Sequence, residues 1–126
     1  MADKLIIDWK QYNLIVEKLA VQIFKSGFKP DMLIGIMRGG APIIDVLSRV
    51  FKLKCAYLAV ESYSGEGTED QQGELVFSRE MSSTVQEMKG NLLLCDDLSD
   101  TGVTLNKSID WLRKYPPLQG NIKDIK

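Results

Sequence analysis

Histidine is absent from the 126 residues, and cysteine occurs only at Cys55 and Cys95. Without histidine the chain cannot build a Ser-His-Asp or Cys-His hydrolase or a His-ligated zinc site. Acid–base and metal chemistry therefore falls to carboxylates, lysines and tyrosines. Each cysteine lies inside an apolar run, which favours two buried free thiols over a disulfide or a redox pair. Free thiols are typical of the cytoplasm, where we expect the protein to be.

Long apolar runs and an excess of charge of either sign are also missing. No apolar run approaches the roughly 20 residues that span a bilayer, and the N-terminus has no apolar segment behind a basic start. Sixteen Lys and Arg against 17 Asp and Glu give a net charge of −1, without the basic excess of nucleic-acid-binding proteins. Chains of about 100–150 residues usually form one core. We therefore expect one soluble domain over residues 1–126, with neither a membrane nor a nucleic acid as partner.

Helix and strand patterns alternate along the chain. Apolar residues at 3–4 spacing from Tyr12 to Phe24 predict an amphipathic helix, with Asp8 as its N-cap and Gly27 as its end. Continuous apolar runs predict strands buried on both faces, at 32–36, 55–60 and 91–95. Other expected elements are helices at 42–51 and 104–115, an edge strand at 75–77 and the start of a strand at 122–125.

This alternation predicts the fold class. Strands and helices joined by short connections form a mostly parallel sheet with helices on both faces. Ligands bind such sheets at the carboxyl ends of the strands, so the loops at 37–41, 61–83 and 96–103 should share one edge. The segment 61–74 carries five acids, three glycines and no base, which is typical of a long flexible loop.

The segment 92–105 carries the strongest functional signal. An apolar strand leads into Asp96 and Asp97, and a turn of small polar residues then opens a helix whose N-terminal dipole suits a phosphate. Carboxylates accept ribose hydroxyls or hold hydrated magnesium, while Ser99, Thr101, Gly102 and Thr104 would wrap a phosphate. An acidic strand end followed by an ordinary helix cap is the alternative, but capping requires neither paired acids nor Gly102. The whole string predicts a sugar-phosphate site.

These residues resemble a known family. Asp96–Thr104 is similar to the phosphoribosyl-pyrophosphate motif of type I phosphoribosyltransferases, in which two acids precede a short spacer and an Asp-Thr-Gly-x-Thr loop. Ile36–Gly40 is similar to the family's pyrophosphate loop, and Ser62-Tyr63 to the start of its mobile catalytic loop. The resemblance covers roughly residues 5–115. It is greatest to the bacterial and archaeal xanthine-guanine and hypoxanthine enzymes.

The resemblance implies an activity and a set of site residues. The chain would have the type I phosphoribosyltransferase fold. It would transfer the 5-phosphoribosyl group from phosphoribosyl pyrophosphate to a purine base (xanthine, guanine or hypoxanthine) and release pyrophosphate. Magnesium would be the cofactor, with Asp97 as its protein neighbour. The implied catalytic residues are Arg38 at the pyrophosphate and Asp100 at the base. The implied substrate-binding residues are Arg38, Gly39, Gly40, Asp96, Asp97, Ser99, Asp100, Thr101, Gly102, Val103 and Thr104.

Further implications concern the loops and the assembly. The family has a cis peptide before the basic residue of the pyrophosphate loop, here Met37-Arg38. The loop from Ser62 to Ser83 would close over the site, with Tyr63 and Arg79 as candidate contacts or, alternatively, as edge packing and plain surface. Asp100 could also serve as a helix N-cap. Related enzymes assemble, so a homo-oligomer, dimer or tetramer, is expected.

One departure from the family concerns the base pocket. The purine enzymes carry a base-reading lysine on the strand after the last helix and an aromatic residue in a C-terminal hood. This chain stops at Lys126, where that strand would begin, so we expect an incomplete last strand and hood. Two other functions stay open: a regulatory module that senses phosphoribosyl pyrophosphate without turnover, and an interaction protein that reuses the fold.

Overall fold

The computed structural model describes residues 6–63, 74–97 and 102–126. Its strands form one six-stranded sheet of order β3-β2-β1-β5-β6, with β4 paired to β2. The strands are β1 Met32–Met37, β2 Cys55–Tyr63, β3 Glu74–Phe77, β4 Ser82–Ser83, β5 Gly90–Cys95 and β6 Ile122–Ile125. The helices are α1 Trp9–Ser26, α2 Ala41–Phe51 and α3 Val103–Lys114, followed by the 3-10 helix η1 Pro116–Leu118. Neighbours among β2, β1, β5 and β6 are parallel, whereas β3 and β4 run antiparallel to β2.

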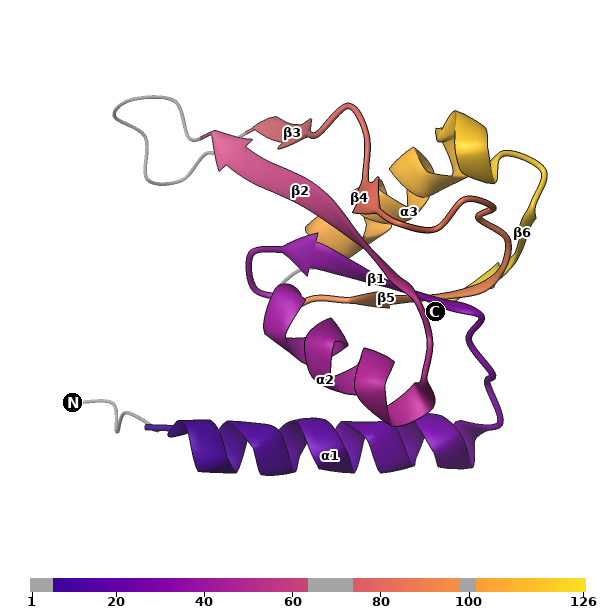
Figure 1. Cartoon of the computed structure of the whole chain (residues 1–126). Coiled ribbons are helices and arrows are strands. Elements are labelled where there is room, and N and C mark those ends of the chain that lie inside the picture. The colour runs from indigo at the N-terminus through magenta and orange to yellow at the C-terminus, as the bar shows by residue number, and fades with distance from the viewer. Residues whose placement is uncertain (1–5, 64–73, 98–101) are drawn as a thin grey trace.

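The helices lie on both faces of this sheet, which confirms the predicted fold class. Figure 1 shows α1 and α2 on one side and α3 on the other. Alternate residues of β1 serve the two sides, because successive side chains of a strand point in opposite directions. Leu33 packs in the cluster that contains Val16 and Ile44, and Ile34 packs in the cluster that contains Leu112. The sheet is therefore buried on both faces.

Local sequence signals set the ends of the helices as predicted. The Asp8 carboxylate accepts from the Gln11 amide at 2.8 Å, and the Gln11 side chain accepts from the Asp8 amide at 3.2 Å, which completes a capping box on α1. Gly27 ends α1 with a φ of 80°, in the left-handed region that favours glycine. Helix α3 ends at Lys114, before Pro116.

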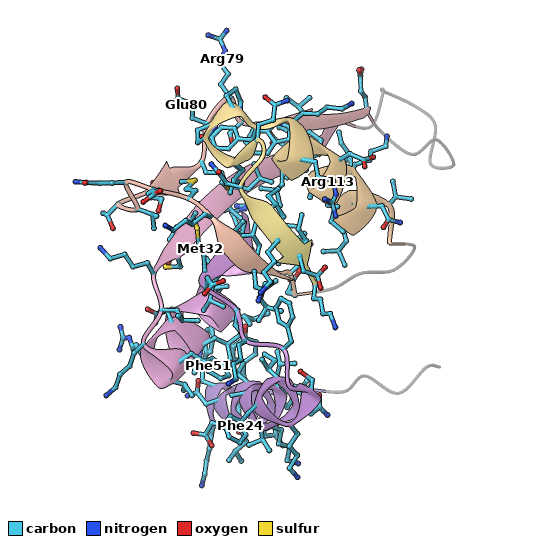
Figure 2. All side chains as sticks on the ribbon, turned by 90° about the vertical axis from the view of Figure 1, so that its right-hand side faces the viewer. Phe24, Met32, Phe51, Arg79, Glu80 and Arg113 are labelled. Atoms are coloured by element: carbon cyan, nitrogen blue, oxygen red, sulfur yellow. The ribbon has the colours of Figure 1, made fainter. Side chains whose placement is uncertain are left out.

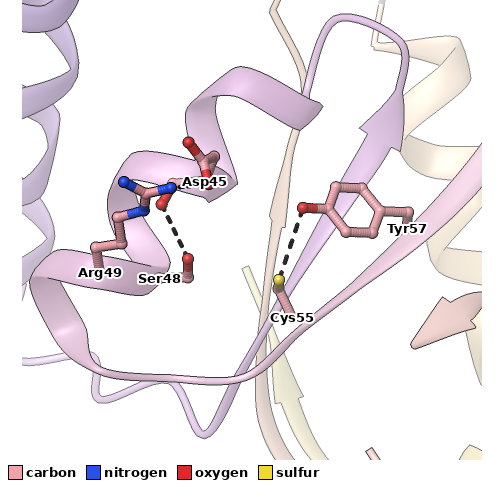
Figure 3. Close-up of polar contacts among 5 residues, drawn as sticks. All are labelled: Asp45, Ser48, Arg49, Cys55 and Tyr57. Carbon is pink, nitrogen blue, oxygen red and sulfur yellow. Dashed lines mark hydrogen bonds and ion pairs between the residues drawn. The ribbon is translucent and has the colours of Figure 1, made fainter. Parts of the chain in front are cut away.

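The C-terminal half of α2 and the start of β2 carry only a few weak polar contacts, all local in sequence (Figure 3). Arg49 lies 3.2 Å from the Asp45 carboxylate, on the helix surface. The Ser48 hydroxyl donates to the Asp45 carbonyl at 2.9 Å. The Cys55 thiol donates to the Tyr57 hydroxyl at 3.8 Å. Exposed ion pairs of this kind contribute little to stability, so apolar burial holds this region together.

The structure corrects the predicted boundaries of the loop at 62–83. Strand β2 continues to Tyr63, and Ser62 pairs with Leu75 in an antiparallel ladder. Ser82 then pairs with Tyr57, so part of the expected loop forms short strands along the edge of β2. Residues 64–73 lie outside the described part of the chain, and closure of a loop over the site stays a prediction.

The start of a strand predicted at 122–125 is present as β6. It pairs in parallel with β5, where Ile122 is opposite Gly90. The ladder continues to Lys126, whose amide donates to the Leu92 carbonyl at 3.0 Å and whose carbonyl accepts from the Leu94 amide at 2.7 Å. Cys55 and Cys95 are both free thiols, as predicted, but only Cys95 is buried; Cys55, at the start of β2, is half-buried. None of the described helices is long and apolar enough to cross a membrane.

Candidate active site

The loop that follows β1 turns back sharply into α2. The peptide bond between Met37 and Arg38 is cis, as the family resemblance implied. The Gly40 amide donates to the Ile36 carbonyl at 2.7 Å, and the Ala41 amide donates to the Arg38 carbonyl at 3.2 Å. Arg38 itself is exposed. The turn thus holds the backbone of Gly39 and Gly40 at the carboxyl end of β1 and leaves the Arg38 guanidinium accessible to an anion.

Two glycines let this loop pack against the end of β5. A Cβ added to Gly39 would overlap the Asp97 carboxylate, and one added to Gly40 would overlap the Cys95 carbonyl oxygen. The loop and the acid pair are therefore in direct contact, although they are far apart in the sequence. This contact agrees with the prediction that the loops after β1 and β5 share one edge of the sheet.

Asp96 and Asp97 follow β5 directly and interact with each other. The Asp97 amide donates to the Asp96 carboxylate at 2.8 Å. Burial raises the pKa of Asp96, and the Asp97 side chain raises it further, while the hydrogen bond from the Asp97 amide opposes both. Asp97 is the more exposed of the two. The pair thus combines a partly buried carboxylate with one that is open to a ligand or a metal ion.

Tyr12 on the first turns of α1 also belongs to this region, and sequence reasoning missed it. Its ring packs on the cluster that contains Cys95, the residue before the acid pair. Burial raises the pKa of its phenol, and the negative charge of Asp97 raises it further. The Trp9 ring packs edge-on against it at 5.5 Å between centroids. The apolar stripe of α1 explained Tyr12 as core. The only sequence feature that could have indicated a role in the site was the Tyr12 hydroxyl, which an aliphatic core residue would lack.

The structure describes only the second half of the predicted phosphate loop. Gly102 has a φ of 76° and precedes α3, whose Asn106 amide donates to the Gly102 carbonyl at 2.9 Å. Val103 and Thr104 form the first turn of α3, so the positive end of its dipole lies close in sequence to the acid pair. Ser99, Asp100 and Thr101 lie outside the described residues, and their roles stay predictions.

A cavity of about 380 Å³ opens beside the loop, between the end of β1 and the β2–β3 hairpin. Arg38 and Glu61 supply its charged groups, and Val60 and Phe77 supply apolar walls. Arg79 is not part of it and points away from the domain (Figure 2). The Ser62 and Tyr63 side chains are not described, so only their place at the end of β2 is known.

The acid pair fits magnesium that arrives with a phosphorylated substrate. Among the described residues, no three acidic or cysteine side chains gather to form a complete metal site. Magnesium, however, is commonly held by one or two carboxylates, together with substrate phosphates and water. Asp96 and Asp97 provide this partial set of ligands, and Gly39 leaves the space that the Asp97 carboxylate occupies.

Comparisons with known proteins agree with this geometry. Residues 5–122 match the phosphoribosyl transferase domain. No curated protein matches the chain. The structure is similar to a purine phosphoribosyltransferase from Pyrococcus horikoshii, with a TM-score of 0.74, 27% identity and coverage of 99% of this chain and 75% of that one.

Two further solved structures show the same fold. One is the xanthine-guanine-hypoxanthine phosphoribosyltransferase of Helicobacter pylori, with a TM-score of 0.70, 20% identity and coverage of 94% of this chain and 76% of that one. The other is a hypothetical protein from Neisseria gonorrhoeae with bound ppGpp, with a TM-score of 0.73, 20% identity and coverage of 99% and 69%. The match to residues 5–122 shows that the chain belongs to the phosphoribosyltransferase family and is an enzyme of that type.

Proposed function

We propose that this chain transfers the 5-phosphoribosyl group of phosphoribosyl pyrophosphate to xanthine, guanine or hypoxanthine and releases pyrophosphate. The contact of Gly39 with Asp97 carries the proposal, because it joins a turn suited to pyrophosphate with carboxylates suited to ribose. The 27% identity with a purine phosphoribosyltransferase supports a purine as acceptor.

Three groups of residues bind the three parts of phosphoribosyl pyrophosphate. Arg38 and the backbone amides of the following glycines bind pyrophosphate through charge-assisted hydrogen bonds. Asp96 and Asp97 accept hydrogen bonds from the ribose hydroxyls. The segment from Ser99 to Thr104, with the N-terminus of α3, binds the 5-phosphate. The first two groups lie at the carboxyl ends of the parallel strands β1 and β5, where ligands bind in sheets of this class.

Asp97 would hold magnesium, with Asp96 beside it. When bound, the ion would neutralise part of the negative charge on the pyrophosphate. Among the described residues no third acidic side chain joins these two carboxylates, so most positions around the ion would be left to substrate and water. The acid pair therefore binds the ion only loosely until the substrate arrives.

The reaction breaks the bond between the anomeric carbon and a pyrophosphate oxygen and forms a bond from that carbon to a ring nitrogen of the base. The bonding electrons leave with pyrophosphate, and positive charge develops on the sugar. The Arg38 guanidinium stabilises the leaving group. The proton of the attacking nitrogen passes to Asp100, the carboxylate proposed to lie beside the base. In this proposal the segment from Ser62 to Ser83 closes over the site and excludes water from the sugar cation.

Calorimetric titration with phosphoribosyl pyrophosphate and magnesium tests binding. The double variant Asp96→Asn, Asp97→Asn should weaken binding by about 2–5 kcal/mol, roughly 30-fold to several thousand-fold, because buried charge-assisted hydrogen bonds are lost. Asp45→Asn is the matched control, since Asp45 pairs with Arg49 on the surface of α2. Equal affinity of the double variant and the wild type would refute the site.

Pyrophosphate release in the presence of each base then tests turnover. Release with xanthine, guanine or hypoxanthine supports the transferase and identifies its acceptor. Tight binding without release for any of the three bases would instead indicate the alternative, a module that senses phosphoribosyl pyrophosphate.

A further inference from the structure

The cavity beside the loop after β1 holds two charges of opposite sign that do not pair with each other. Arg38 and Glu61 both line this cavity, and both side chains are exposed. Neither forms an ion pair within the described part of the chain. A pocket for an anion needs cations and hydrogen-bond donors, which Arg38 and the backbone amides of the loop supply. The Glu61 carboxylate is the opposite of what a free anion requires.

The strand ladder fixes the position of Glu61 beside the loop. Strand β1 ends at Met37, which is opposite Ala59, and β2 continues past it to the hairpin with β3 (Figure 1). Glu61 lies two residues beyond Ala59 and pairs with Val76. The Ser78 amide donates to the Ala59 carbonyl at 2.9 Å, and the Ala59 amide donates to the Ser78 hydroxyl at 3.3 Å. The backbone that carries the carboxylate is therefore held in place before any ligand binds.

Glu61 lies on the face of the sheet that α2 covers. Successive side chains of a strand point to opposite faces, and Cys55 and Tyr57 of β2 pack in the cluster that contains Ile44 of α2. Glu61 continues this alternation. Helix α2 begins directly after the loop, with Gly40 as its N-cap. The carboxylate thus lies on the same side as the helix N-terminus that would receive the pyrophosphate.

Apolar walls strengthen the effect of both charges. Val60, Val76 and Phe77 line the cavity between the charged side chains and the hairpin. The Phe77 ring stacks on Trp111 of α3, with 6.2 Å between the ring centroids, so this wall is supported from behind. Charges interact more strongly beside apolar walls than in open water, because the effective dielectric constant is lower. A fixed carboxylate in this place should therefore have a measurable effect on an anionic ligand.

We propose that Glu61 makes the site select the magnesium complex of pyrophosphate over metal-free pyrophosphate. This inference rests on the proposed function, which places pyrophosphate at Arg38. Free pyrophosphate carries only negative charge, so Arg38 attracts it and Glu61 repels it. A bound magnesium ion gives the same ligand a positive centre. The complex then carries charges of both signs, as the cavity does, and the Glu61 carboxylate becomes an attractive group.

Calorimetric titration with inorganic pyrophosphate tests the selection, in EDTA and in a series of magnesium chloride concentrations up to saturation. The wild type should bind more tightly with magnesium, by a ratio of affinities that we call the magnesium factor. Glu61→Gln keeps the shape of the side chain and removes its charge. It should bind metal-free pyrophosphate about fivefold more tightly and the magnesium complex no more tightly than the wild type, so the magnesium factor should fall about fivefold.

Two further variants control for net charge and for side-chain chemistry. Glu80→Gln removes the same charge from an exposed glutamate that does not line the cavity and lies beside Arg79 at the surface (Figure 2). It should leave both affinities at the wild-type values. Glu61→Asp keeps the charge and should retain most of the magnesium factor. Circular dichroism checks that all three variants fold.

Failure of this inference and failure of the proposed function give different results. A wild type that does not bind magnesium pyrophosphate would refute the proposed function and this inference with it. Normal binding by the wild type, with the same magnesium factor in Glu61→Gln, would overturn the role of Glu61 alone. Weaker binding by Glu61→Gln with and without magnesium would also overturn it, because the carboxylate would then only orient Arg38.

Discussion

Gly39 and Gly40 are adjacent, yet alanine at the two positions should affect different properties. Gly40→Ala should lower the stability of the fold, and Gly39→Ala should weaken substrate binding. Gly40 has φ −77° and ψ −14°, which any residue adopts, so glycine is needed there only for space. Its added Cβ would overlap the Cys95 carbonyl and the Ile36 backbone, atoms of two paired strands that cannot move independently. Overpacking of a rigid site typically costs about 1–3 kcal/mol, so Gly40→Ala should cost about 3 kcal/mol. That is a large part of the roughly 5–15 kcal/mol of an ordinary domain.

Gly39→Ala meets a movable obstacle instead. Its added Cβ would overlap the Asp97 carboxylate, which is the end of an exposed side chain that can rotate away. The free energy of unfolding should change by less than about 1 kcal/mol, since alanine also restricts the unfolded chain by about 0.4–1 kcal/mol. The displaced carboxylate no longer lies where substrate and magnesium need it. Their joint affinity should fall about 10–100-fold.

Urea denaturation and calorimetric titration of both variants separate the two effects. Gly40→Ala should lower the urea midpoint strongly, and Gly39→Ala should leave it almost unchanged while it weakens binding of phosphoribosyl pyrophosphate with magnesium. Gly27→Ala is a control for backbone strain without overlap, because nothing lies within 4 Å of its added Cβ but its φ of 80° is unfavourable for alanine. Equal destabilisation by Gly39→Ala and Gly40→Ala, with normal binding by the folded Gly39→Ala, would refute the assignment of Gly39 to the Asp97 contact.

Three further predictions concern titrating groups. Asp97→Asn should lower the pKa of the Tyr12 phenol, because the carboxylate charge that raises it is removed; NMR of ¹³C-labelled tyrosine measures this, and an unchanged titration would contradict the placement of Tyr12. Burial raises the pKa of Cys95 to about 12. Iodoacetamide should therefore modify the half-buried Cys55 first and Cys95 only as fast as the chain unfolds, which peptide mass spectrometry detects; equal rates would contradict this. Asp96→Asn should raise the free energy of unfolding at neutral pH, as denaturation at several pH values would show.

Elements with local signals were predictable from the sequence. The ends of α1 follow from Asp8 and Gly27, whose capping geometry involves only residues within one turn. The three central strands follow from continuous apolar runs, because strands covered on both faces need apolar side chains on both. Parallel strands then bring the loops after β1 and β5 to one edge, and the Gly39–Asp97 contact confirms this.

The features that were missed depend on contacts between distant segments. Polar residues at the end of β2 have the composition of a loop, yet Ser62 pairs with Leu75 because a free sheet edge accepts any backbone. Ser82 pairs with Tyr57 for the same reason. The approach of Tyr12 to the acid pair depends on how α1 lies across the sheet, which no periodicity within α1 determines.

The acid pair also predicts a conflict between stability and binding at Asp96. Its folded-state pKa is raised mainly by burial, so the folded chain holds the proton more tightly than the unfolded chain does. The free energy of unfolding must then fall as the pH rises from the ordinary value, near 3.9, to the raised value, and it stays lower above that window. Asp96→Asn carries no charge and keeps an oxygen that accepts from the Asp97 amide, so this fall should be absent. The two proteins should be equally stable below the window, and the variant should be the more stable one above it. A variant that is less stable than wild type at neutral pH would show that favourable contacts, rather than burial, dominate the Asp96 environment.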